Sequence, residues 1–225
     1  MIKIFAKTKL IICCLLLLMQ SSCIKEVVTN VPKITEVYNN NFELYDQKKI
    51  QVQGHINGIF QLLKNISIVD YNGSKVLGNF NNSKIDLKLD SLPLHNALNI
   101  QFDLYIQDNW RNDMWKMVFD NNEVLVTGFS NNKDRQQAYP NWINAGYTLN
   151  PAGSNAFDLT LPGACRYSKI IGGTSHYKME RTIIHSDSTF KFSASDAGEF
   201  FELTCDRSWS IDNLKISAIY NITTK

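Results

Sequence analysis

The sequence lacks the short motifs that usually identify an enzyme or a metal centre. It contains no HExxH, CxxC, GxSxG or Walker A pattern, and its four histidines have no mutual spacing typical of zinc ligands. No stretch of a dozen residues keeps a 3.6-residue apolar period, which argues against helix-rich and alternating α/β classes. We therefore predict a β-rich protein that is not an enzyme. Scattered carboxylates leave a glycosidase pair open, because such a pair is defined by separation in space.

The chain also lacks an excess of either charge once its first residues are set aside. Three of its 23 Lys and Arg residues lie among the first 22 residues, which leaves 20 against 21 Asp and Glu residues. Nucleic-acid binding needs a dense cationic footprint, and none remains. We expect no nucleic-acid partner.

The apolar run Leu10–Met19 is about half the length that a membrane-spanning helix needs. Three lysines precede this run, and small residues lead from it to Cys23. The pattern is typical of a bacterial lipoprotein signal peptide. We predict a signal peptide over residues 1–22 and lipid attachment at Cys23. The expected location is the bacterial cell envelope, anchored to a membrane and facing the periplasm or the exterior.

Few cysteines remain after this leader. Cys13 and Cys14 belong to it and Cys23 is the predicted lipid site, so Cys165 and Cys205 are left. Two such cysteines usually pair in an oxidising compartment. A bridge that closes a loop of about 40 residues contributes about 4 kcal/mol. We predict a disulfide, and two separately buried thiols are the alternative.

Alternation of apolar and polar residues begins at about Phe42. Residues 24–42 are polar and rich in Asn, which predicts a tether over residues 23–41. The clearest alternation runs from Leu98 to Ile106, where every second residue is apolar. Further strands are predicted at residues 49–54, 58–63, 66–70, 85–89, 114–119, 123–127, 156–161, 177–184, 190–193 and 211–216.

Turn residues between these runs indicate hairpins. Asn57-Gly58, Asn72-Gly73 and the stretch Asp120–Asn122 all suit tight connections, and hairpins imply antiparallel pairing. About 200 residues and about ten strands fit one domain. We predict an all-β fold, an antiparallel two-sheet β-sandwich of the jelly-roll type, over residues 42–219, with a C-terminal tail at 220–225.

The segment from Asn131 to Asn155 is long, irregular and aromatic, and such connections are often functional. Carbohydrate modules stack flat rings against sugars while neighbouring amides bind hydroxyl groups. The predicted ligand-binding residues are therefore Trp142, Tyr139, Tyr147, Asn141 and Gln137. The alternative is that these rings fix the loop onto the sandwich. Trp115 and Trp209 border strands and are predicted to lie in the core.

Five motifs occur in an order that resembles a known pattern. They are Leu92-Pro93-Leu94-His95, Phe102–Ile106 with Asp108-Asn109-Trp110, Phe129-Ser130-Asn131, Gln137-Ala138-Tyr139-Pro140 and Ser208–Asn213. Together they resemble an uncharacterised β-sandwich family of secreted or surface-anchored bacterial proteins. The closing motif is also similar to the last strand of MAM-like and carbohydrate-binding jelly rolls. The resemblance implies a sandwich fold and an extracellular setting, and it implies no reaction.

The family pattern also suggests a structural calcium ion near its Asp-x-Trp and Trp-x-x-Asp turns. Asp108 and Asp212 would be the ligands, because calcium favours clustered oxygen atoms. Arg111 and Arg207 stand where the family often has acids. An arginine paired with Asp108 or Asp212 is the alternative to the metal.

These observations favour a lipid-anchored, non-catalytic binding module outside the cytoplasm. Its expected partners are the membrane, through the lipid, and a glycan or another surface polymer. The first alternative is a structural or adhesion subunit that contacts a surface protein. The second is a glycoside hydrolase or lyase on a sandwich scaffold. Fold alone does not decide among these functions.

Overall fold

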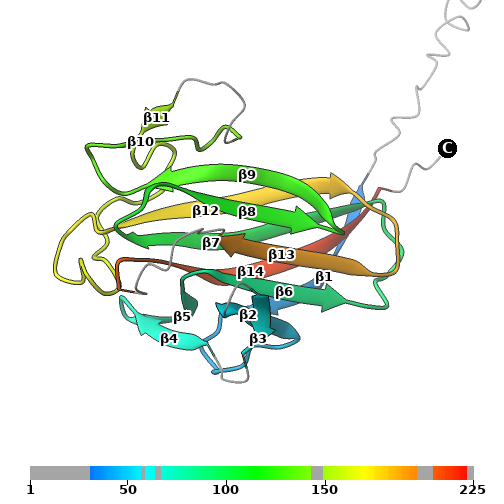
Figure 1. The fold of residues 1–225 in the computed structure, drawn as a ribbon. Coiled ribbons are helices and arrows are strands. Elements are labelled where there is room, and N and C mark those ends of the chain that lie inside the picture. Colours follow the sequence, from blue (N-terminus) through cyan, green and yellow to red (C-terminus); the bar gives the residue numbers. More distant parts are fainter. Residues whose placement is uncertain (1–30, 57–58, 64–66, 143–148, 197–204, 222–225) are drawn as a thin grey trace, which may run out of the picture. The chain divides into compact units, whose positions relative to one another are not determined.

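The computed structural model describes residues 31–56, 59–63, 67–142, 149–196 and 205–221. Two antiparallel six-stranded sheets face each other and form a sandwich (Figure 1). Consecutive strands mostly alternate between the sheets, as in a jelly roll. The predicted all-β, two-sheet antiparallel fold is confirmed, and the described residues form fourteen strands rather than about ten.

The strands of the two sheets have the following bounds. Sheet A contains β12 (Thr174–Ile184), β7 (Ala97–Asp108), β14 (Arg207–Asn221), β5 (Ser74–Phe80) and β4 (Ile68–Tyr71) in this order, and β1 (Pro32–Asn40) also pairs with β14. Sheet B has the order β3 (Ile59–Leu62), β2 (Ile50–Ile56), β6 (Ser83–Leu89), β13 (Phe190–Asp196), β8 (Arg111–Phe119) and β9 (Asn122–Ser130). The short strands β10 (Gln136–Gln137) and β11 (Asn150–Pro151) form a separate pair (Figure 1).

The core lies between the sheets and is rich in aromatic rings. Every second residue of β7 from Leu98 to Ile106 faces inward, and none of these five apolar residues is more than 4% exposed. Trp115 on β8 meets Trp209 on β14 edge to face, with ring centroids 6.0 Å apart. Both tryptophans are fully buried, as predicted. Each large apolar side chain buried in this way contributes about 2 kcal/mol to stability.

Two of the predicted hairpin turns are confirmed. Asn72 and Gly73 connect β4 to β5 with positive φ angles of 48° and 85°. Asp120 and Asn121 connect β8 to β9 with φ angles of 47° and 69°. These residue types tolerate the left-handed conformation that two-residue hairpins require. The Asn57-Gly58 turn lies outside the described residues.

The predicted tether is wrong where it covers β1. Residues 32–40 pair with β14 from Asn221 back to Leu214. β1 is mostly exposed, so its sequence carries little apolar alternation, and backbone pairing holds it in the sheet. Residues 220 and 221 likewise belong to β14 rather than to a tail.

The predicted strand at 156–161 is reduced to an isolated bridge between Asp158 and His176. The leader and Cys23 lie outside the described residues.

Candidate functional site

The outward-facing side chains of β7, β12 and β14 form a polar surface on sheet A. Tyr105 on β7 lies opposite His176 on β12, and Asp103 lies opposite Asp212 on β14. Two adjoining hollows open on this surface, and Asn213 lines both. The Tyr105 hollow, about 300 Å³, is lined by Tyr71, Asn72, Ser74, Tyr105, Asp158, Leu161, His176, Asp212 and Asn213. The Lys178 hollow, about 330 Å³, is lined by Gln101, Phe102, Asp103, Lys178, Met179, Glu180 and Asn213.

Three rings form the aromatic part of the Tyr105 hollow. The Tyr105 ring stacks against His176 with centroids 4.7 Å apart and an interplanar angle of 24°. Tyr71 meets Tyr105 edge to face at 5.5 Å, and its hydroxyl donates to the carbonyl oxygen of Pro162 at 2.6 Å. Burial raises the pKa of Tyr71 to about 12, so its phenol stays neutral. The rings are thus fixed before any ligand arrives.

Asp103 is held in its ionised form. One of its carboxylate oxygens lies 2.8 Å from Nε2 of His176, and the other accepts a hydrogen bond from the Asn213 side-chain amide at 2.8 Å. Burial by itself would raise the pKa of Asp103. The bonds to His176 and Asn213 outweigh burial and hold the pKa below its usual value.

Asp212 is in the opposite situation. Its residue is 4% exposed, and its carboxylate accepts a hydrogen bond from the backbone N–H of Asn213 at 2.7 Å. Burial, reinforced by the negative charges of Asp103 and Glu43, raises the pKa of Asp212 to about 7. The two neighbouring carboxyls therefore differ in protonation at neutral pH.

The Lys178 hollow continues the polar surface along β7 and β12. The side-chain amides of Gln101 and Asn99 donate to the Glu180 carboxylate at 2.8 and 2.9 Å. These hydrogen bonds lower the pKa of Glu180. The Lys178 ammonium lies 3.9 Å from the centre of the exposed Phe157 ring. Planar amides, carboxylates and rings therefore follow one another along the face.

The sequence predicted a different ligand site, and the structure places two of its residues inside the loop. Gln137 is fully buried, and its side-chain oxygen accepts hydrogen bonds from the N–H groups of Ser130 and Gly153. Tyr139 packs against Phe129 and Tyr177 with ring centroids 4.7 and 5.1 Å away. Through these contacts Gln137 and Tyr139 hold the described part of the loop of residues 131–155 against the sandwich.

Of the remaining predicted ligand residues, Asn141 lies near the edge of sheet B. The backbone oxygen of Asn141 accepts a hydrogen bond from the Thr127 hydroxyl on β9 at 2.6 Å. Trp142 is 41% exposed and lines neither hollow. Tyr147 lies outside the described residues. Ligand contact by this segment stays a prediction and rests on Trp142.

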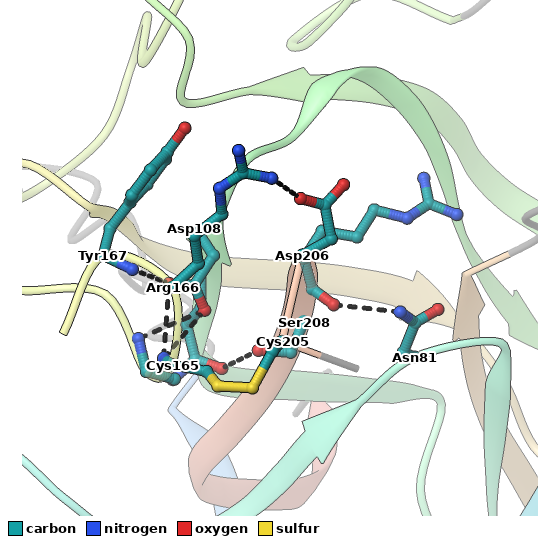
Figure 2. Close-up of a disulfide and its surroundings, with 11 residues drawn as sticks. Asn81, Asp108, Cys165, Arg166, Tyr167, Cys205, Asp206 and Ser208 are labelled. Atoms are coloured by element: carbon teal, nitrogen blue, oxygen red, sulfur yellow. Dashed lines mark hydrogen bonds and ion pairs between the residues drawn. A yellow bond between two sulfur atoms is a disulfide. The ribbon is translucent and has the colours of Figure 1, made fainter. Parts of the chain in front are cut away.

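The predicted disulfide between Cys165 and Cys205 is confirmed (Figure 2). Asp108 lies beside it, and its carboxylate accepts hydrogen bonds from the backbone N–H groups of Ala164, Cys165 and Tyr167 at 3.3, 3.1 and 2.8 Å. Burial raises the pKa of Asp108, and these three hydrogen bonds oppose the rise. Asp108 therefore anchors the loop that carries Cys165.

The calcium hypothesis fails for the pair Asp108 and Asp212. The first lies opposite Arg207 and the second opposite Asp103, five positions away along β7. At about 3.4 Å per residue the two backbones are about 17 Å apart, too far to share one ion. Among the described residues, no group of three or more His, Cys, Asp or Glu side chains could hold a metal.

The arginine alternative is also wrong in its partners. The Arg207 guanidinium lies 2.6 Å from Asp113, and Arg111 donates to the Asn109 side chain at 3.3 Å. Neither bond involves Asp108 or Asp212. The reason is positional, because Arg207 points toward the start of β8 rather than toward the middle of the sheet A face.

Comparisons with known proteins find solved structures that are distantly similar to this chain. No protein-family model and no curated protein matches the sequence, so the motif resemblance remains unconfirmed. The K3 cleaved adhesin domain of Lys-gingipain from Porphyromonas gingivalis is 13% identical, with a TM-score of 0.43, over 82% of this chain and 100% of that one.

Two carbohydrate-binding modules are similarly distant. A family 35 module from Clostridium thermocellum is 11% identical, with a TM-score of 0.33, over 83% of this chain and 97% of that one. The CBM22-1 xylan-binding domain of Xyn10C from Paenibacillus barcinonensis is 9% identical, with a TM-score of 0.37, over 84% of this chain and 96% of that one. None of these similarities assigns a function.

No helix of the described residues has the length and apolarity to cross a membrane.

Proposed function

We propose that the protein is a non-catalytic module that binds a glycan on the outer face of sheet A. The observation that carries this proposal is the Tyr105 hollow, which places fixed aromatic rings beside carboxylate and amide groups. A pyranose presents an apolar face that stacks on a flat ring, while its hydroxyl groups hydrogen-bond to planar acceptors and donors. The hollow offers both kinds of contact at one place.

The adjoining Lys178 hollow favours an extended ligand over a single sugar. Asn213 lines both hollows, and the amides of Gln101 and Asn99 continue the polar surface beyond it. A chain of sugar units could therefore lie across β7, with one unit on Tyr105 and its neighbours on the amide row. This supports an oligosaccharide or polysaccharide as the ligand.

The test is affinity electrophoresis or a glycan array with Tyr105→Ala and Tyr105→Phe. Tyr105→Ala should weaken retention at least about tenfold because it removes the stacking ring. Tyr105→Phe keeps the ring and should retain binding, which controls for folding. Trp142→Ala tests the loop site in the same assay. Loss of retention in Trp142→Ala alone would move the site to that loop, and retention by no glycan would reject the proposal.

We further propose that the module is attached to a bacterial envelope membrane through lipid on Cys23. The lysine-rich start, the short apolar run and the small residues before Cys23 support this. The disulfide supports an oxidising compartment. Labelling of cells with a fatty-acid analogue should mark the wild-type protein and not Cys23→Ala. Equal labelling of both would exclude Cys23 as the attachment point.

A second candidate function, protein adhesion, is favoured by β3. This strand lies at the edge of sheet B, and its Ile59, Phe60 and Leu62 are 65%, 42% and 58% exposed. Exposed apolar edge strands are suited to pairing with another chain. Crosslinking in intact cells that captures one dominant partner, without competition by sugars, would favour adhesion.

Release of shorter oligosaccharides from a polysaccharide by the purified protein would instead identify a glycoside hydrolase or lyase.

A further inference from the structure

One carboxylate in the Tyr105 hollow lacks a counter-charge within the described part of the chain. Asp212 is 4% exposed, lines the hollow and forms no ion pair there. Its hydrogen bond comes from the backbone N–H of its own neighbour, Asn213. A desolvated carboxylate is stabilised by a cation or by several donors, and the described residues supply Asp212 with neither.

The charged groups around Asp212 do not supply that cation. Asp103 and Glu43 are negative and act unfavourably on its charge. His176 acts favourably on the charge of Asp212, but its ring is already bonded to Asp103 at 2.8 Å. Lys178 faces Asp103 across the strands and has its ammonium over the Phe157 ring. The hollow is therefore lined by two acids, Asp158 and Asp212, and by one base, His176, which is already bonded to Asp103.

The aromatic rings around Asp212 add a second feature that suits a cation. Tyr105 and Tyr71 line the same hollow, and their ring faces carry partial negative charge. A ligand ammonium beside Asp212 would meet a carboxylate and aromatic rings together. Uronic acids and sulfated sugars would instead meet like charge, which disfavours them by repulsion.

We infer that the glycan bound in the Tyr105 hollow carries free amino groups, as in the glucosamine units of a deacetylated polysaccharide, and that an ammonium group pairs with Asp212. This inference rests on the proposed function of the same hollow. Beyond glycan binding, it specifies that the ligand is positively charged and that Asp212 recognises this charge. Where Asp212 is protonated before binding, pairing with an ammonium releases one proton to the solvent.

The experiment is isothermal titration calorimetry of the protein with glucosamine oligomers and with N-acetylglucosamine oligomers of equal length. At about pH 6 we expect the amino form to bind at least about tenfold more tightly. Titration in two buffers of different ionisation enthalpy should show release of a proton with the amino form only.

Asp212→Asn should bind both oligomers equally and release no proton. Asp90→Asn, just after β6 in sheet B and away from both hollows, is the matched control and should keep the preference. A preference that survives in Asp212→Asn, or equal binding of both oligomers by the wild type, overturns this inference and leaves the proposed function in place. Binding of no glycan, amino, acetylated or neutral, rejects both. Unchanged thermal melting of Asp90→Asn and cooperative melting of Asp212→Asn establish that the variants fold.

Discussion

Asp103 and Asp212 lie opposite each other on neighbouring strands, yet the pKa values of their carboxyls are displaced in opposite directions. The difference comes from their partners. Asp103 is bonded to His176 and Asn213, whereas burial dominates at Asp212. Two aspartates on adjacent strands thus acquire different charge states from their burial and from two or three neighbouring groups.

The raised pKa of Asp212 predicts a pH-dependent gain in stability for Asp212→Asn. The folded protein holds a proton on Asp212 that the unfolded chain releases near pH 4, so this group favours folding in acid. That contribution falls as the pH rises to about 7 and is absent above it. Since one pKa unit corresponds to about 1.4 kcal/mol, the variant should gain roughly 2–3 kcal/mol over the wild type between about pH 5 and about pH 8.

The measurement is urea denaturation of both proteins across this pH range. Asp158→Asn is a suitable control, because hydrogen bonds from Thr160 lower the pKa of Asp158 and keep it ionised throughout. Its stability difference from the wild type should not change with pH. A flat difference for Asp212→Asn would show that the Asp212 carboxyl is already solvated.

The sequence singled out Asp212 but gave it the wrong partner. The Trp-x-x-Asp motif marked it as a calcium ligand with Asp108, whereas β14 places it against Asp103. Tyr105 and His176 were missed altogether. The alternation along β7 already predicted that Tyr105 and Asp103 face outward, but His176 lies 73 positions from Asp103 and only strand pairing joins them.

β5 and β14 come unusually close together at Gly78. A Cβ atom on Gly78 would lie 1.9 Å from the Ser210 hydroxyl oxygen and 2.8 Å from the Ser210 Cα. The second distance involves backbone, so a change of rotamer at Ser210 cannot relieve the clash. The hydroxyl of Ser210 also accepts a hydrogen bond from the Asn79 N–H at 2.9 Å, which fixes the approach of the two strands.

Gly78→Ala should therefore destabilise the protein by about 3 kcal/mol, measured by thermal or chemical denaturation. Gly54→Ala on β2 is the matched control. The closest atom to its added Cβ is a terminal methyl of Leu63 at 3.2 Å, which can move aside. Its effect should stay within about 1 kcal/mol. Similar losses in both variants would mean that the alanine side chain, rather than the strand approach, is responsible.

Strands with strong alternation were predicted well, and the strands β1 and β5, which lack it, were not. β7, β6 and β13 have buried residues at every second position and were all predicted. β1 is an exposed edge strand without such a pattern. β5 carries Gly78 and buries Val76 and Leu77 in succession, and no strand was predicted there. An apolar period of two residues reports burial of one face: β1 is too exposed to show it, and β5 buries residues on both faces.

The disulfide and Asp108 together tie the end of β7 to two loops that are distant in sequence. Cys165 and Cys205 are 40 positions apart, and Asp108 binds three backbone N–H groups of the first loop. Figure 2 shows the carboxylate and the bridge side by side, with the Arg166–Asp206 ion pair across them. Covalent and hydrogen-bonded restraints therefore act on the same segment.

Removal of the bridge in Cys165→Ala/Cys205→Ala should lower the free energy of unfolding by about 4 kcal/mol on the chain-entropy estimate. The variant should still fold, because the core between the sheets does not include either cysteine. Urea denaturation with and without reductant checks this. Reductant should destabilise the wild type and leave the variant unchanged. Destabilisation of both proteins by reductant would show that the reductant does not act through the Cys165–Cys205 bridge.

Overall, the fold class and the disulfide could be predicted from the sequence, but the binding surface could not. Alternation and turn residues define strands and antiparallel pairing locally. The Tyr105 hollow arises only when β12 and β14 take places on either side of β7, with Asp158 and Leu161 at its rim. That arrangement depends on which distant strands become neighbours, and no local pattern encodes it.

The pairing of β1 with β14 also has a mechanical consequence. Pro32 lies opposite Asn221, and the ladder runs inward from there to Asn40 and Leu214. If the chain before Pro32 is held at a membrane, a load on a bound ligand passes through this ladder. Tension along the strand axis shears all of its hydrogen bonds at once, whereas a sideways pull opens them one at a time. Under that condition, the β1–β14 ladder would resist a pull along the strand axis and yield to a pull across it.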